Sequence, residues 1–151
     1  MTKKIPLVLA LVILIFLFLV SSAPEEKGFS YDFNLNGLIN GKEIRLAIAD
    51  MPQERAKGLS GHRPLSMSEG LIFIFDAEGI HGIWMKDMSF AIDVIWFDSQ
   101  KKIVGMRENF EPSSFPEIAY PIKPSSYALE VASGFIKSND LTIGGRIEFE
   151  I

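Results

Sequence analysis

The chain has 151 residues, of which 48% are hydrophobic and 23% charged, a balance typical of a folded globular protein. It contains no cysteine and only two histidines, His62 and His81. This composition excludes disulfides, thiolate metal sites and three-histidine centres, and we expect neither a metal nor a cofactor. Because the net charge is −4, we do not expect nucleic acid as a partner, since its phosphates are neutralised by basic side chains.

The first residues are predicted to be a targeting or anchoring segment. Lys3 and Lys4 precede an uncharged apolar run over residues 5–20, which is followed by small residues and then by an acidic pair. This order is typical of a signal peptide or an N-terminal membrane anchor. We therefore expect a hydrophobic helix over residues 1–23, a tether over 24–29 and a folded domain over 30–151. The domain would be extracytoplasmic, either anchored to the membrane or released by cleavage. The sequence does not distinguish a location in the periplasm from one on the outer surface.

The folded domain is predicted to begin with a β-hairpin. Apolar and polar residues alternate from residue 31, and Asn-Gly at residues 40–41 suits a type I′ turn. Pairing across that turn sets Leu35 opposite Leu46 and Phe33 opposite Ile48. The apolar side chains of the hairpin would then share one face.

The remaining elements are predicted to be short strands with one short helix. Asp50 and Gln53 resemble a capping box and Gly58 suits a helix end, which places the helix over residues 51–57. The prolines between residues 111 and 126 predict a long loop that contains no interior strand. Apolar strands are expected at 71–75, 80–85, 90–97, 103–107, 127–132 and 146–151, with a helical turn at 135–138. This pattern predicts a mainly β fold, a compact sandwich or barrel, after the N-terminal hydrophobic helix.

Several charged residues lie in apolar surroundings. Asp93 lies within the strand predicted at 90–97, so we expect it to be buried and to be paired with Arg55, Lys86 or backbone N–H groups. Arg55 lies on the predicted helix, either as a bidentate donor to a carboxylate or on a solvated surface. Lys86 and Asp87 either lie in a ligand-binding site with Arg55 and Asp93 or are exposed charges on a loop.

Other polar residues give weaker signals. Glu130 alternates with Leu129 and Val131, which predicts that its side chain faces water. His81 is interpreted as a loop or strand-end histidine. The sequence contains no phosphate-binding glycine loop, no zinc-protease motif, no serine-hydrolase elbow and no EF-hand loop, so catalytic residues stay unknown.

Five segments stand in an ordered series: ERAKGL at 54–59, EGLIFIF at 69–75, WMKDM at 84–88, IDVIWF at 92–97 and YALEV at 127–131. On these segments the chain resembles the DUF192 family from about residue 44 to the C-terminus. The resemblance implies a compact, mainly β fold related to jelly-roll sandwiches, an exported protein and no particular reaction. Asp87-Met88 stands where the family usually has Asn-Thr, which would alter charge and hydrogen bonding if that pair contacts a ligand.

These observations favour a non-catalytic binding domain for a small polar ligand such as a sugar or an anionic metabolite. One alternative is a hydrolase of cell-envelope carbohydrate or ester that uses Asp87, Asp93 or Glu130 as general acid or base. Another is a structural or partner-binding module in which Arg55 and Asp93 hold the fold. The residues expected to surround the ligand are Arg55, Trp84, Lys86, Asp87, Asp93 and Tyr120.

Overall fold

The computed structural model describes residues 31–150, so the predicted hydrophobic helix and tether lie outside the described residues. No helix within residues 31–150 has the length and apolar character needed to cross a membrane. The described strands are β1 (Leu35–Ile39), β2 (Lys42–Ala49), β3 (Glu69–Gly79), β4 (Ile83–Trp84), β5 (Ile92–Phe97), β6 (Ile103–Phe110), β7 (Ile118–Ala119), β8 (Ser125–Ala132) and β9 (Ile147–Phe149). The helical segments are α2 (Pro52–Lys57), the 3-10 turn η1 (Pro112–Ser114) and α3 (Phe135–Ser138).

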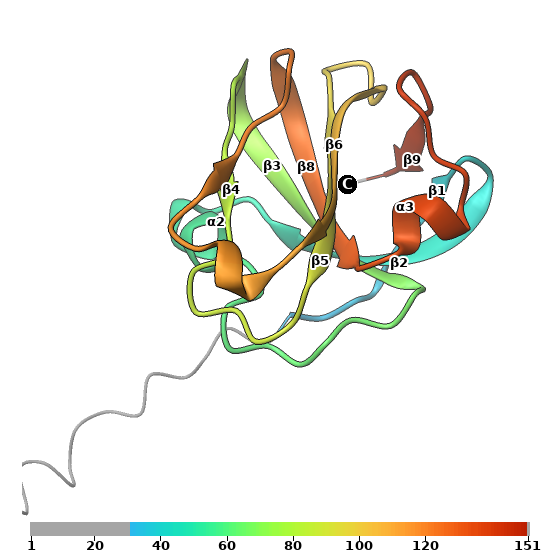
Figure 1. Ribbon diagram of the computed structural model, residues 1–151. Helices are drawn as coiled ribbons and strands as arrows, with labels where there is room; N and C mark the ends of the chain where they lie inside the picture. The colour runs from blue at the N-terminus through green and yellow to red at the C-terminus, as the bar shows by residue number, and fades with distance from the viewer. Residues whose placement is uncertain (1–30, 151) are drawn as a thin grey trace, which may run out of the picture. The chain divides into compact units, whose positions relative to one another are not determined.

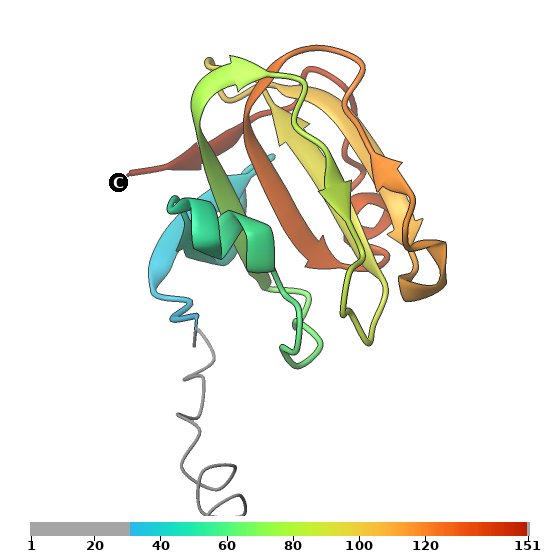
Figure 2. The same cartoon turned by 90° about the vertical axis from the view of Figure 1, so that its left-hand side faces the viewer.

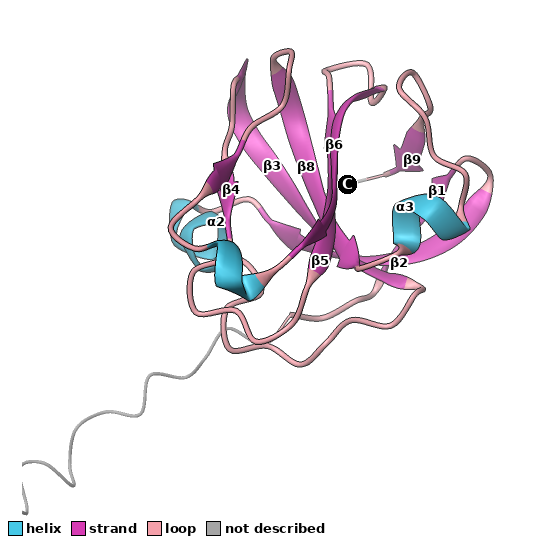
Figure 3. Cartoon of the chain, viewed as in Figure 1, coloured by secondary structure: helices cyan, strands magenta, loops and turns pink. Residues whose placement is uncertain are grey.

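The fold is mainly β, as predicted, with a few short helices (Figure 3). Seven strands form one sheet in the order β6-β5-β8-β3-β2-β1-β9, while β4 and β7 form a separate two-stranded sheet (Figure 1). The large sheet curls until its two edge strands approach each other. The backbone N–H of Ile103 donates to the carbonyl of Gly145 at 2.8 Å, and Lys102 bridges Arg146. The strands thus form a half-barrel with a small second sheet.

The predicted hairpin forms with the expected turn and register. Leu35 is paired with Leu46, and Asn40 and Gly41 both have positive φ angles, 51° and 75°, as a type I′ turn requires. The strand is shorter than predicted, however, because β1 begins at Leu35. The expected pairing of Phe33 with Ile48 is therefore wrong. Phe33 instead packs against the second core cluster, with its ring 5.8 Å from the ring of His62.

Helix α2 occupies the crossover between the parallel strands β2 and β3. The carboxylate of Glu54 accepts hydrogen bonds from the N–H groups of Asp50 and Met51, each at 3.2 Å. Met51 is the N-cap and Glu54 is the acceptor, so the predicted pair of Asp50 and Gln53 is displaced by one residue. Gly58 ends the helix with φ 51° and ψ −138°, which is outside the expected left-handed helical region.

Strand β8 is an interior strand of the sheet, between β5 and β3, and is buried on both faces. Leu129 and Val131 belong to the core enclosed by the curled sheet, which α3 also covers with Phe135 and Ile136. Ala128 belongs to a second core on the opposite face. In Figure 2, α2 and the β4–β7 sheet lie on the viewer's side of β8. The second core therefore lies beneath these elements, and this arrangement positions the candidate site.

Candidate functional site

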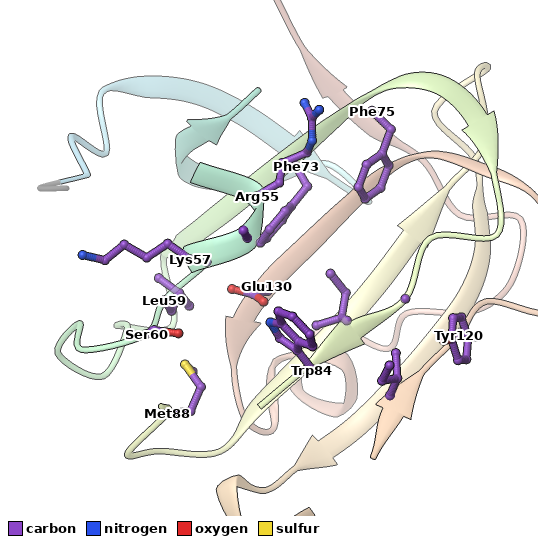
Figure 4. Close-up of a pocket in the computed structure, with 15 residues that line it drawn as sticks. Arg55, Lys57, Leu59, Ser60, Phe73, Phe75, Trp84, Met88, Tyr120 and Glu130 are labelled. Carbon is purple, nitrogen blue, oxygen red and sulfur yellow. The ribbon is translucent and has the colours of Figure 1, made fainter. Parts of the chain in front are cut away.

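A pocket of about 360 Å³ opens on the second face of the sheet, between the end of α2 and strand β4 (Figure 4). Side chains from β3, β7 and β8 complete its walls. Its size is in the range of small-molecule sites in proteins. The labelled lining residues are Arg55, Lys57, Leu59, Ser60, Phe73, Phe75, Trp84, Met88, Tyr120 and Glu130.

Glu130 lies at the base of this pocket. Glu130 is only 4% exposed, and in Figure 4 its carboxylate lies between the rings of Phe73 and Trp84. The backbone N–H of Leu59 donates a hydrogen bond to the carboxyl group. Within residues 31–150, no group donates to its Oε2 atom. A buried carboxylate oxygen without a donor is costly, so this atom is available to a ligand.

Burial also changes the acidity of this group. Desolvation raises the pKa of Glu130 from 4.5 to about 8, and the hydrogen bond from Leu59 opposes the shift only in part. The carboxyl group is therefore mostly protonated at neutral pH. Tyr31 lies close enough for its pKa to be raised as well, by its own burial first and then by the charges of Glu130 and Glu54. A perturbed acid in a concave site marks a functional candidate.

Gly58, the residue that follows α2, sets the shape of the pocket above Glu130. A Cβ atom on Gly58 would lie 3.5 Å from both carboxylate oxygens of Glu130, and the positive φ of Gly58 disfavours any side chain. The glycine therefore keeps the space above the carboxyl group open. It also lets the chain turn so that the next N–H, that of Leu59, points to the carboxyl group.

Aromatic residues form the rim and the inner wall. Trp84 is 42% exposed and Tyr120 is 56% exposed, which leaves part of each ring accessible. Phe75 is held by stacking on His81, with ring centroids 3.7 Å apart and planes inclined by 14°. Gly82 lets Tyr120 lie close to β4, because a Cβ atom there would be 2.6 Å from the Tyr120 ring. Stacking thus holds the ring of Phe75, and the missing side chain of Gly82 makes room for the ring of Tyr120.

Arg55 lines the pocket, but its guanidinium group is directed away from Glu130 (Figure 4). It donates to the carbonyl of Ile74 at 2.9 Å, to the carbonyl of Asp50 and to the carboxylate of Asp76 at 3.0 Å. These partners join α2 to β3. Arg55 thus donates to a carboxylate through one nitrogen and to two carbonyls through the other, and is neither the bidentate carboxylate donor nor the solvated surface residue that the sequence suggested.

Asp93 is fully buried but lies outside the pocket. Its two carboxylate oxygens accept the backbone N–H groups of Asn109, at 2.8 Å, and Ile136, at 2.9 Å. The sequence allowed three kinds of partner for Asp93: Arg55, Lys86 or backbone N–H groups. The structure shows backbone N–H groups. Asp93 was expected to surround the ligand together with Trp84, but β5 presents it on the face opposite to the pocket.

Lys86 and Asp87 are exposed and do not line the pocket. Their main chain is tied to the segment after α2: the Ser60 hydroxyl donates to the Lys86 carbonyl at 2.7 Å, and the Gly61 N–H donates to the Asp87 carbonyl at 3.3 Å. Asp87 has a φ of 56°, a conformation enriched in Asn and Asp. This explains why Asp can replace the Asn that the family resemblance led us to expect. Of the six predicted ligand residues, the pocket brings together Arg55, Trp84 and Tyr120.

Alternation along the strand predicted that Glu130 faces water, and the residue was otherwise named only as a general acid or base of the hydrolase alternative. Its place at the bottom of the pocket was not predicted. Alternation along one strand predicts which residues share a face, but it does not show whether a second layer covers that face. One signal was available. Ala128 and Ala132 flank Glu130 on its own face, and such a face is more apolar than a solvated one. Phe73, Phe75 and Met88 also line the pocket, and the sequence could not show this because it depends on how separate elements pack together.

The fold and the site define this chain as a mainly β half-barrel protein with a pocket on one face of its sheet. Comparison with known proteins then gives its family. The family model DUF192, described as Uncharacterized ACR, matches residues 36–149. This protein belongs to the DUF192 family. No curated protein matches the chain.

Two crystal structures share the fold. A candidate transcription regulator from Sinorhizobium meliloti 1021 is 25% identical, with a TM-score of 0.74 over 80% of this chain and 96% of that one. A protein of unknown function from Novosphingobium aromaticivorans DSM 12444 is 20% identical, with a TM-score of 0.72 over 84% of this chain and 91% of that one. The family and these neighbours establish the fold and leave the molecular function open.

Proposed function

We propose that this DUF192 protein is a non-catalytic binding domain for a small polar ligand, held in the pocket above Glu130. The observation that carries the proposal is the unpartnered, buried Oε2 atom of Glu130 at the base of an aromatic pocket. A ligand donor directed at this atom would offset the cost of its burial. Trp84 and Tyr120 would provide the contact surface at the entrance.

The sequence suggested a sugar or an anionic metabolite as the ligand. A sugar is supported by the accessible ring of Trp84 and the acceptor on Glu130. An anion is supported less, because Arg55 already donates to three protein acceptors and a negative ligand would face the Glu130 carboxyl group. Both classes belong in the test.

The location is also a proposal. We propose that the domain is exported and tethered to the membrane by residues 1–23, on the strength of the basic, apolar and acidic order at the N-terminus. Protease added to spheroplasts, from which any outer barrier has been removed, should digest the domain while a cytoplasmic marker stays intact. Protection equal to that of the marker would contradict export. The transcription role named for one structural neighbour is not carried over, because 19 acidic residues outnumber 15 basic ones here.

Ligand-induced thermal shifts of the full chain test the binding function. Sugars, small carboxylates and peptidoglycan fragments should be screened against the wild type, Trp84→Ala and the control Met67→Ala, an exposed apolar residue outside the pocket. At least one compound should raise the melting temperature of the wild type and of Met67→Ala but not of Trp84→Ala. Equal shifts in all three proteins would contradict a site at Trp84.

A hydrolase remains the second candidate because the raised pKa of Glu130 suits a general acid at neutral pH. Among the described residues, however, no second carboxylate lines the pocket, and Asp93 lies on the other face. Turnover of a cell-envelope ester or glycoside that Glu130→Gln abolishes would favour this alternative. A purely structural module is supported by the hydrogen bonds of Asp93, and it predicts that no compound binds at Trp84.

A further inference from the structure

We propose that the pocket above Glu130 selects a small organic cation, a protonated amine whose N–H groups contact the Glu130 carboxylate while its apolar part lies against Trp84 and Phe73. This inference rests on the proposed binding function and names the ligand class. Glu130 is 4% exposed, one of its carboxylate oxygens lacks a donor within residues 31–150, and both oxygens face the space that Gly58 leaves open.

The fold supplies this carboxylate with little compensation for a negative charge. The backbone N–H of Leu59 is the group that favours its ionised form, and the neighbouring titratable group Tyr31 is itself acidic. The guanidinium of Arg55 is engaged by Asp76 and two carbonyls and points away from Glu130 (Figure 4). A ligand cation would therefore supply the positive charge that Glu130 needs in order to ionise at low cost.

The walls of the pocket suit the rest of such a ligand. The rings of Phe73, Phe75, Trp84 and Tyr120 and the thioether of Met88 line it. Aromatic faces attract cations through their quadrupoles, and this attraction is stronger in a desolvated site. The apolar part of the amine would meanwhile be buried against the same rings.

The two ligand classes suggested by the sequence fit less well. A sugar carries hydroxyl groups around its ring, and each needs a partner when it is buried. The inner wall offers the Glu130 oxygen and the Ser60 hydroxyl, which already donates to the Lys86 carbonyl. An anion would lie against a carboxyl group with the nearest guanidinium already engaged. An amine needs one strong acceptor and apolar walls, which Glu130 and the aromatic rings provide. Lys57 also lines the pocket, but its side chain extends away from Glu130 (Figure 4).

The test uses three probes of one shape that differ in charge: benzylammonium, benzyl alcohol and benzoate. Their binding to the full chain is measured by titration calorimetry at pH 7 in two buffers of different ionisation enthalpy, with glucose and N-acetylglucosamine as sugar probes. We expect benzylammonium to bind at least about tenfold more tightly than benzyl alcohol, and benzoate to bind weakest. Because free Glu130 is mostly protonated, binding of the amine should release a proton, seen as a buffer-dependent enthalpy.

Two variants localise the effect. Glu130→Gln keeps the size of the side chain and should remove both the preference for the amine and the release of a proton. Glu148→Gln makes the same chemical change at an exposed position outside this pocket and should leave both unchanged.

Each contrary result has a distinct meaning. Equal or tighter binding of benzyl alcohol, benzoate or a sugar, lost in Trp84→Ala, would overturn the cation inference and leave the proposed binding function standing. A preference for the amine that persists in Glu130→Gln would overturn it as well. Failure of every probe and of the wider ligand screen at this pocket would overturn both proposals.

Discussion

Asp93 and Glu130 are buried acids on neighbouring strands that point to opposite faces of the same sheet. In the register of β5 and β8, Glu130 pairs with Val94 and Asp93 pairs with Val131, so the two carboxyl groups differ by one position along the pleat. Asp93 accepts two backbone N–H groups, while one oxygen of Glu130 has no donor within residues 31–150. The fold thus has one acid suited to a structural role and one suited to a ligand.

Asp93→Asn should destabilise the protein by about 2–4 kcal/mol, because an amide nitrogen would replace one of the two acceptors and face a backbone N–H group. Chemical denaturation measures the change in the free energy of unfolding. Asp76→Asn is the control, since that side chain is 84% exposed, and it should change the stability by less than about 1 kcal/mol. Similar small effects of both substitutions would contradict a structural role for Asp93.

Glu130 should make the stability depend on pH. Its pKa is raised from 4.5 to about 8, so between these values the native state binds more protons than the unfolded state, and stability falls as the pH rises. Glu130→Gln cannot lose a proton. The free energy of unfolding of this variant should be close to that of the wild type near pH 5 and higher by a few kcal/mol near pH 9. Thermal unfolding across this range measures the difference, and a difference that is independent of pH would exclude the raised pKa.

Arg55→Ala should cost about 1–3 kcal/mol because it leaves the carbonyl of Ile74 without this donor and releases α2 from β3. The comparison with Asp76→Ala separates the contributions. Asp76 is exposed, so its removal should cost less than about 1 kcal/mol. Denaturation of both variants is the measurement. If Asp76→Ala cost as much as Arg55→Ala, the exposed ion pair rather than the backbone contacts would hold the helix.

Gly82→Ala should displace Tyr120 from the rim of the pocket. The new Cβ atom would lie 2.6 Å from the Tyr120 ring and 2.5 Å from the Ile118 side chain, so both must move. We expect a loss of about 1–3 kcal/mol. The double variant Gly82→Ala/Tyr120→Ala should lose less than the sum of the single variants, because the two residues touch. Additive losses in denaturation would contradict this contact.

The local elements of this protein were predictable from residues close together in the chain. The Asn-Gly turn, the register that pairs Leu35 with Leu46, and the helical turn at Phe135–Ser138 depend on nearby residues, and the structure contains all three. The family motifs likewise identified DUF192. Burial of Asp93 followed from the apolar residues on both sides of it in one strand.

The site, in contrast, depends on how distant segments pack together. Whether Glu130 faces water or a pocket depends on which segments cover β8, and those segments, the end of α2 and strand β4, are far from it in the chain. The same holds for Arg55, whose partners on β3 were not identifiable from its own helix. Periodicity fixes the face on which a side chain lies, but solvation depends on the layer packed over that face, which residues distant in the sequence supply.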